Sequence, residues 1–275
     1  QVKAVQVEMQ GQLREIRSVL TVAADGRESL LRRRARLPVQ DLGAPIDVLW
    51  FRLSRRPGDP EETMGRFEAG RIIVMLNRGS YWQCAFVISK GGIEETRAAG
   101  LAAFRDTIAG LLGFSPDRTS EIRSWDDVKL LTVKVDRLKS WCKPGLLCIG
   151  DAAHAMSPVG GVGINLAVQD AVAAANILAF PLAHGTVDLD TLRRVQKRRG
   201  WPTRVTQRLQ LVIQNNVIAP TLQSRKFERP PLVARMLTSW PLLRRIPARL
   251  LALGVRPEHV SEEIRTSSGQ MAGVR

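Results

Sequence analysis

The chain has 275 residues, of which 44% are hydrophobic, and it carries a formal net charge of +15. This composition predicts a globular protein of one or two domains, and the longest apolar run, residues 171–183, is too short to cross a bilayer. Three scattered cysteines predict buried free thiols in a reducing, cytoplasmic setting, and three dispersed histidines argue against a metal site. The charge is concentrated from residue 191 onward, where 17 lysines and arginines stand against four acids, a balance of +13.

The first 45 residues predict short strands and one helix. Residues 1–7 and 13–18 are typical of a hairpin around Gln10-Gly11, and residues 18–22 predict a further strand that ends in an Asp-Gly turn. Asp25 in this turn can cap the helix that follows, which carries Ser29 and Arg32 in its first turns. Asp-Gly turns are common, so these residues by themselves indicate only a strand, a turn and a capped helix.

The middle of the chain is typical of an antiparallel sheet with a helix beside it. Residues 46–55 alternate between two faces, and residues 71–76 and 81–88 predict a hairpin. The candidates to line a substrate pocket on this sheet are Trp50, Arg52, Trp82 and Cys84, although core packing beneath a helix explains each of them singly. Residues 94–112 predict an amphipathic helix, and residues 125–135 return the chain to the sheet.

The most informative segment runs from residue 145 to residue 171. A short apolar strand, residues 146–149, leads into Gly150-Asp151, a loop of small residues, Pro158-Val-Gly-Gly-Val-Gly163, and a helix from about Ile164. A carboxylate at the end of a strand accepts hydrogen bonds from hydroxyl groups. Glycine backbone allows close approach, and the unpaired amides of a helix N-terminus face electron-rich atoms. The segment therefore predicts a site for a large polar cofactor, with a buried strand and a core helix as the simpler alternative.

The same segment closely resembles the second flavin fingerprint of the class A FAD-dependent monooxygenases, the family that includes p-hydroxybenzoate hydroxylase-like and ubiquinone-biosynthesis hydroxylase-like enzymes. In that family Gly-Asp-Ala-Ala-His precedes Pro-x-x-Gly-x-Gly-x-Asn, as it does here. The resemblance implies that Asp151 binds the ribityl hydroxyls of FAD and that Pro158 shapes the loop near the reactive side of the ring. It also implies that backbone groups meet the pyrimidine edge of the flavin, namely those of Gly160, Gly161, Val162, Gly163, Ile164 and Asn165.

A second match lies upstream. Ala23-Ala-Asp-Gly-Arg-Glu-Ser-Leu-Leu-Arg32 resembles the family signature Gly-Ala-Asp-Gly-x-x-Ser-x-Val-Arg, with Ala23 where the family usually has glycine. In the family this turn lies beside FAD and the path of the pyridine nucleotide, which implies that Asp25 belongs to the cofactor site. The two motifs stand 126 positions apart in the order that the family has them, so each supports the other.

The family's opening unit has no counterpart in this sequence. That unit carries Gly-x-Gly-x-x-Gly and holds the adenosine half of FAD, whereas the Gly-x-Gly here, Gly161-Val-Gly163, occurs in another place and lacks the later glycine. We therefore expect the chain to correspond to about the last two-thirds of a family member. We also expect that the chain alone holds FAD weakly or not at all.

The C-terminal part predicts basic helices. Residues 192–217 are typical of a long helix broken near Trp201-Pro202, and a Pro-rich irregular region begins at Pro220. Residues 241–253 predict a short basic amphipathic helix that suits peripheral contact with an anionic membrane, and a solvated face of Arg-rich helices is the alternative. Nucleic acid is not an expected partner, because no aromatic-basic platform or known binding module is present.

The expected fold class is α/β (α+β), with a partial FAD-binding Rossmann-like domain, an inserted antiparallel substrate-domain sheet and C-terminal helices. The resemblance implies a hydroxylase that uses NAD(P)H and O2 to oxygenate a small aromatic or apolar molecule. Because the cofactor carries that chemistry, no catalytic residue is assigned. The expected regions are residues 1–45 and 136–185 of the FAD-binding domain, 46–135 of the substrate domain, and the basic helical region 186–275.

Other functions remain open at this stage. A flavin-dependent reductase or dehydrogenase of the same fold is the alternative enzyme, and a fragment that does not hold FAD alone is the alternative without activity. A halogenase is less favoured, because the sequence contains no Trp-x-Trp-x-Ile-Pro.

Overall fold

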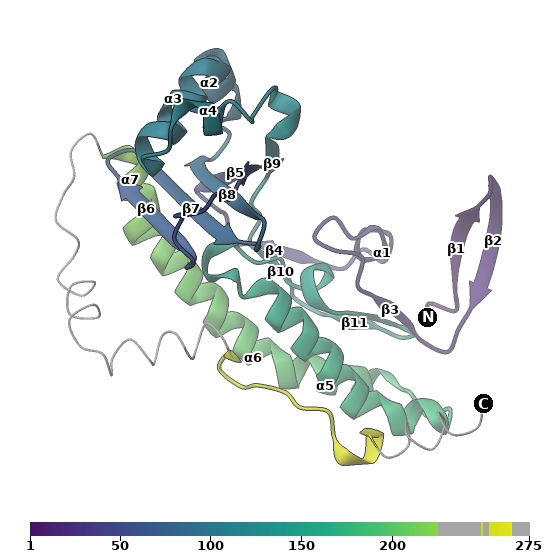
Figure 1. The fold of residues 1–275 in the computed structure, drawn as a ribbon. Helices are drawn as coiled ribbons and strands as arrows, with labels where there is room; N and C mark the ends of the chain where they lie inside the picture. The colour runs from purple at the N-terminus through teal and green to yellow at the C-terminus, as the bar shows by residue number, and fades with distance from the viewer. Residues whose placement is uncertain (225–248, 250–252, 266–275) are drawn as a thin grey trace. The chain divides into compact units, whose positions relative to one another are not determined.

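The computed structural model describes residues 1–224, 249 and 253–265 (Figure 1). The chain divides into two compact units, which we call the motif unit and the sheet unit. The motif unit comprises Gln1–Gly43, Lys134–Gln210 and Leu237–Arg275, and the sheet unit comprises Ala44–Val133 and Leu211–Met236. Two of the boundaries, after residues 43 and 133, fall two residues before those expected from the sequence. The helix over residues 189–213 contributes to both units instead of beginning a separate C-terminal region.

A small sheet in the motif unit contains the strands that lead into both sequence motifs. Its strand order is β11 (Cys142–Lys143), β12 (Leu146–Cys148) and β3 (Thr21–Ala23). Strand β12 runs parallel to β3, with Leu147 opposite Val22, and antiparallel to β11. All three residues of β12 are buried, so the expected buried strand is confirmed. Because the two strands are parallel, their carboxyl ends lie at the same edge of the sheet, and the turns that follow them lie close together.

Two further strand pairs belong to the motif unit. The expected N-terminal hairpin is confirmed, with β1 (Ala4–Met9) and β2 (Gln12–Arg17) joined at Gln10 and Gly11, both of positive φ. Strand β4 (Val39–Asp41) pairs with β10 (Asp136–Leu138). Helix α1 (Leu30–Arg34) is capped by Ser29, whose hydroxyl accepts from the amide of Arg32 at 3.0 Å. The expected cap, Asp25, instead accepts from the amide of Leu31 at 3.3 Å.

Two long helices complete the described part of the motif unit, α5 (Gly163–Ala183) and α6 (Leu189–Ile213). With the turn before it, α5 forms an apolar segment, Val159–Ala183, that is long enough to cross a membrane by length and composition. It exceeds the run seen in the sequence because it begins before residue 171. A single helix of this kind is also typical of the core of a soluble protein, and 28% of its most apolar window is buried.

The expected break in α6 at Pro202 is wrong. The helix continues through this proline, which is buried, and the hydroxyl of Thr206 donates to the Pro202 carbonyl at 3.0 Å. Proline removes one backbone hydrogen bond, and the burial of Thr203 and Thr206 beside it shows that packing holds the helix at this point. A π-helical turn, Gln214–Ile218, and the short helix α7 (Ala219–Gln223) follow, so a helix spans Pro220 where an irregular region was expected.

The sheet unit is built on one five-stranded antiparallel sheet with the order β6-β7-β8-β5-β9. The expected hairpin is confirmed as β7 and β8, whereas β6 was not expected. The predicted helix over residues 94–112 is two helices, because Gly100 interrupts it with a φ of +92°. The elements are β5 (Ile46–Ser54), β6 (Met64–Glu68), β7 (Arg71–Asn77), β8 (Tyr81–Ser89), α2 (Ile93–Ala98), α3 (Leu101–Leu112), α4 (Pro116–Thr119) and β9 (Lys129–Leu131).

Helix α3 packs on one face of this sheet. Phe104 makes edge-to-face contacts with Phe51 and Phe86, and both pairs of ring centroids are 5.6 Å apart. Trp82 and Cys84 belong to the same core cluster and have no exposed surface. All three cysteines of the chain are buried free thiols. The predicted basic helix over residues 241–253 lies outside the described residues, apart from Arg249 and Leu253.

Candidate functional site

The Gly-Asp turn follows directly from the parallel strand pair. The amide of Ile149 donates to the carbonyl of Ala23 at 3.0 Å, which extends the ladder by one residue before the chain turns at Gly150. Gly150 has a φ of +58°, and a Cβ at this position would lie 3.0 Å from the Cβ of Ala167 on α5. Both the backbone conformation and the closeness of α5 therefore require glycine here.

The two sequence motifs meet at Asp151. A guanidinium nitrogen of Arg27, Nη2, lies 3.3 Å from Asp151 Oδ2, although the residues are 124 positions apart. Both side chains are partly exposed, at 29% for Arg27 and 28% for Asp151. The other terminal nitrogen of Arg27, Nη1, is buried without a hydrogen-bond partner among the described residues. A half-exposed carboxylate and an unused donor therefore lie side by side at the end of the strand pair.

Asp25 occupies a different position in the first motif. Its side chain is exposed and faces the start of α1 through the amide of Leu31. Burial would raise the pKa of Asp25, but hydrogen bonds from the hydroxyl of Ser29 and from the Leu31 amide outweigh it and lower the pKa. The carboxylate is thus ionised near neutral pH and anchors α1. Arg27, two positions further on, is the residue of this motif that reaches Asp151.

The glycine-rich loop presents bare backbone. Gly160 and Gly161 have φ values of +80° and +66°, both are exposed, and open space surrounds the position of a Cβ on Gly161. Ile164 and Asn165 at the start of α5 are also exposed. Pro158 and Gly163 are half-buried. Val162 is the exception, because its side chain packs in a small core with Met156 and Leu166 and leaves only its backbone for a ligand.

Two glutamines of α6 donate hydrogen bonds to backbone carbonyls in and beside this loop. The amide nitrogen of Gln210 donates to the carbonyls of Ser157 and Val159 at 2.9 and 2.8 Å. The amide nitrogen of Gln207 donates to the carbonyls of Asp136 and Ala155 at 2.8 and 3.1 Å. Both glutamines are buried. The sequence analysis did not single them out, although two amides three positions apart on a helix share one face and could have been noticed.

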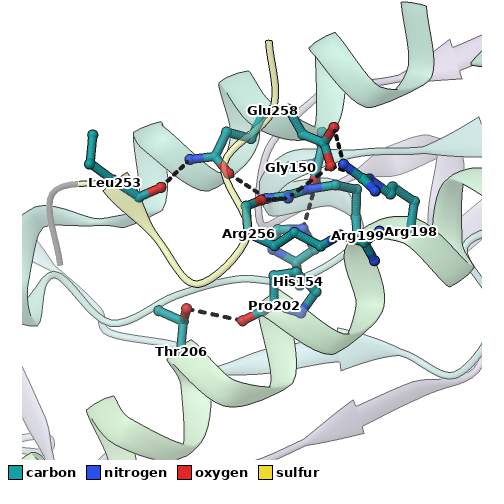
Figure 2. Close-up of polar contacts among 11 residues, drawn as sticks. Gly150, His154, Arg198, Arg199, Pro202, Thr206, Leu253, Arg256 and Glu258 are labelled. Carbon is teal, nitrogen blue, oxygen red and sulfur yellow. Dashed lines mark hydrogen bonds and ion pairs between the residues drawn. The ribbon is translucent and has the colours of Figure 1, made fainter. Parts of the chain in front are cut away.

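A buried ionic cluster fixes the Gly-Asp turn to the long helices (Figure 2). Asp170 on α5 accepts from the amide of Gly150 at 3.0 Å and from Arg199 Nε at 3.1 Å. His154 Nε2 lies 2.5 Å from the same carboxylate, and the His154 ring packs on Trp141. The side chains of Asp170, His154 and Arg199 are at most 1% exposed. Burial would raise the pKa of Asp170, but His154, the Gly150 amide and Arg199 outweigh it and lower the pKa.

The four predicted substrate-contacting residues lie on two different faces of the sheet. Leu53 of β5 pairs with Trp82, and Phe51 pairs with Cys84, so Trp82 and Cys84 share the face that α3 covers. Trp50 and Arg52 point to the opposite face. Trp50 is half-buried, and the exposed Arg52 places its guanidinium 3.8 Å from the centre of the Tyr81 ring. Only Trp50 and Arg52 therefore retain surface that a substrate can touch.

Comparison with known proteins identifies the family. A family model described as FAD binding domain matches residues 1–208. The chain is 31% identical over 254 residues to 6-methylpretetramide 4-monooxygenase of Streptomyces rimosus, covering 90% of this chain and 60% of that protein. The chain thus spans a little over half the length of that relative.

Solved structures share the fold. An anhydrotetracycline hydroxylase from Streptomyces rimosus superposes with a TM-score of 0.65 at 19% identity, covering 94% of this chain and 51% of that one. A probable FAD-dependent monooxygenase from Pseudomonas aeruginosa superposes with a TM-score of 0.61 at 20% identity, covering 79% and 61%. At these identities the likeness concerns the fold alone. Because the family match takes in most of the sequence and both flavin motifs, the chain belongs to the FAD binding domain family of class A FAD-dependent monooxygenases.

Proposed function

We propose that this chain forms the part of an FAD-dependent hydroxylase that holds the flavin ring and ribityl chain and accepts the substrate. The observation that carries the proposal is the contact between Arg27 and Asp151, two residues 124 positions apart that belong to the two motifs. The relative named 6-methylpretetramide 4-monooxygenase supports a monooxygenase that acts on a small aromatic or apolar molecule. NAD(P)H and O2 are the proposed co-substrates, because the family chemistry requires a reductant and an oxidant.

The residues at this edge fit FAD. Asp151 is a half-exposed acceptor suited to ribityl hydroxyls, and the buried Nη1 of Arg27 is a donor that needs an acceptor. The exposed backbone of Gly160 and Gly161, with the N-terminus of α5 after it, suits the electron-rich pyrimidine edge of the flavin. When bound, FAD supplies the redox chemistry, by taking electrons from NAD(P)H and passing them to O2.

The chain's own residues hold and orient the cofactor. Arg27 donates to one oxygen of the Asp151 carboxylate and limits its rotation, which leaves the other oxygen to accept from a ligand. Asp170 fixes the amide of Gly150, and Gln210 fixes the carbonyls on either side of Pro158. The loop is thus set before a ligand arrives, which reduces the entropy lost on binding. On the sheet unit, Trp50 and Arg52 are the proposed contacts for an aromatic substrate.

The cofactor assignment is tested by Asp151→Ala, with Asp190→Ala as the control because Asp190 is an exposed acid of the same unit that lies at the start of α6. Loss of a charge-assisted hydrogen bond costs about 1.5–3 kcal/mol, so flavin affinity should fall roughly 10- to 100-fold. Quenching of flavin fluorescence on titration with the protein measures the affinity. Equal affinity of Asp151→Ala and Asp190→Ala would remove Asp151 from the site.

The reaction class is tested by following NAD(P)H and O2 together. A hydroxylase consumes both when an aromatic substrate is added, and the product gains one oxygen atom. A reductase or dehydrogenase of the same fold oxidises NAD(P)H without incorporating oxygen, so mass spectrometry of the product under 18O2 separates the two. An unlabelled, reduced product would overturn the hydroxylase.

A further inference from the structure

A cavity in the motif unit is lined by residues outside the two flavin motifs. It has a volume of about 540 Å³ and is open to solvent. Its walls come from α5, from α6 and from residues 253–261, which we call the C-terminal strap. The residues that line it include Ala173, Ile177, Arg194, Lys197, Arg198 and Arg256. None of these is a proposed flavin or substrate contact.

The wall formed by the C-terminal strap is held in place by hydrogen bonds (Figure 2). Gln169 donates to the Leu253 carbonyl at 3.0 Å, and Arg199 donates to the Arg256 carbonyl at 2.9 Å. Asn176 donates to the carbonyl of residue 259 at 2.8 Å and accepts from the amide of residue 261 at 3.0 Å. These four hydrogen bonds tie the strap to α5 and α6 and hold this wall of the cavity in place.

Positive charge in this cavity exceeds what the described residues neutralise. Arg198 forms a bidentate pair with Glu258, at 2.6 Å from Nε and 3.1 Å from Nη2. Arg199 also approaches Glu258, which is the only acid among the described residues that line the cavity. The side chains of Arg194, Lys197 and Arg256 form no hydrogen bond or ion pair with any residue in the described ranges. Three cations that share one cavity repel each other, and a bound anion would relieve that repulsion.

We propose that this cavity binds a phosphomonoester with an apolar body. Two guanidinium groups and one ammonium group suit a dianionic phosphate better than a carboxylate, because the phosphate offers more charge and three oxygens to forked donors. Ala173 and Ile177 supply an apolar wall, which favours an organic phosphate over inorganic phosphate. The site is separate from the proposed flavin site, so its ligand is a second small molecule or the head of a lipid.

The test uses the full chain and the variant Arg194→Gln/Lys197→Gln. Its matched control is Arg193→Gln, since Arg193 is adjacent in sequence but pairs with Asp190 and does not line the cavity. Isothermal titration with phenyl phosphate and with inorganic phosphate measures soluble ligands. Co-sedimentation with phosphatidic acid vesicles, against phosphatidylcholine vesicles, measures lipid heads. Circular dichroism verifies that each exposed substitution leaves the fold unchanged.

We expect phenyl phosphate to bind more tightly than inorganic phosphate, and the double variant to weaken it roughly 10- to 100-fold. Arg193→Gln should change affinity less than about twofold. The chain could instead bind phosphatidic acid vesicles and not phenyl phosphate, with binding weakened in the double variant but not in Arg193→Gln. That result would identify the ligand as a lipid headgroup and would equally support the phosphomonoester site. Equal losses in the double variant and the control would show diffuse charge attraction, and absence of binding in both arms would also overturn the proposal.

Discussion

Replacing Asp170 by asparagine tests whether the buried ionic cluster sets the stability of the motif unit. The substitution keeps the shape of the side chain and removes its charge. Arg199 would then remain fully buried with Glu258, Gln169 and one carbonyl as partners, and His154 Nε2 and the Gly150 amide would face a weaker acceptor. Removing one member of a buried ion pair typically costs about 3–5 kcal/mol, so we expect a loss of that size in the free energy of unfolding.

The assay is urea unfolding followed by near-ultraviolet circular dichroism, with a double-variant cycle. Asp170→Asn, Arg199→Met and the two together are compared, because removing both charges avoids leaving either one buried alone. The double variant should be less destabilised than the sum of the single variants by at least about 1 kcal/mol. Additive losses, or a loss below about 1 kcal/mol for Asp170→Asn, would refute the view that the cluster acts as a unit.

Acid titration of the same variants checks the sign of the pKa shift. The folded pKa of Asp170 is lowered below its unfolded value of 3.8, so its contribution to stability is complete above that value and is lost as the pH falls through the folded pKa. The groups that face its carboxylate are His154, Arg199 and the Gly150 amide. Asp170→Asn should therefore lose less stability than the unsubstituted chain between pH 4 and pH 2. In thermal unfolding, its melting temperature should fall less steeply over this pH range.

Three other predictions concern the turn, the thiols and the sheet. Gly150→Ala should lower the unfolding free energy by about 1–3 kcal/mol more than Gly185→Ala, because both glycines have positive φ but only Gly150 faces a close Cβ; equal losses in urea unfolding would contradict this. Burial raises the pKa of Cys84 and Cys148 to about 12, so a thiol reagent at pH 8 should label them only after denaturation, and rapid labelling of the folded chain would show that they are accessible. Trp82→Ala should cost about 3–5 kcal/mol of stability, whereas Trp50→Ala should cost less stability, because Trp50 is only half-buried, and should raise the KM for an aromatic substrate; the reverse pattern would exchange their roles.

The strand, turn and helix of the Gly-Asp motif could be predicted from the sequence because they are formed by residues that are close to one another in the chain. The buried strand before Gly150, the turn at Asp151 and the helix that begins at Gly163 follow one another within 18 residues. Local residue types are enough to specify such a strand, turn and helix. The hairpins of both units were predicted for the same reason.

Features that depend on distant pairing were not predicted. The register between β5 and β8 puts Trp82 opposite Leu53, and no single strand reveals which of its faces a partner strand shares. The side chains of Arg199 and Gln207 resemble solvated residues in a polar helix, yet both are buried by contacts 29 or more positions away in the chain. Strand β6 was missed because four of its five residues are exposed and it lacks a clear apolar face.

The buried ionic cluster also constrains the order of events during synthesis of the protein. Asp170 gains its guanidinium partner only after residue 199 has been made, and Arg199 gains Glu258 only after residue 258. At about 5–20 residues per second, the ribosome needs roughly 5–20 s to travel from residue 165 to residue 258. The Gly-Asp turn is complete in the nascent chain before then, but its supporting charges are not. Full support of the Gly-Asp turn is therefore a late event in biogenesis, because a nascent chain arrested before residue 199 lacks the guanidinium that pairs with Asp170.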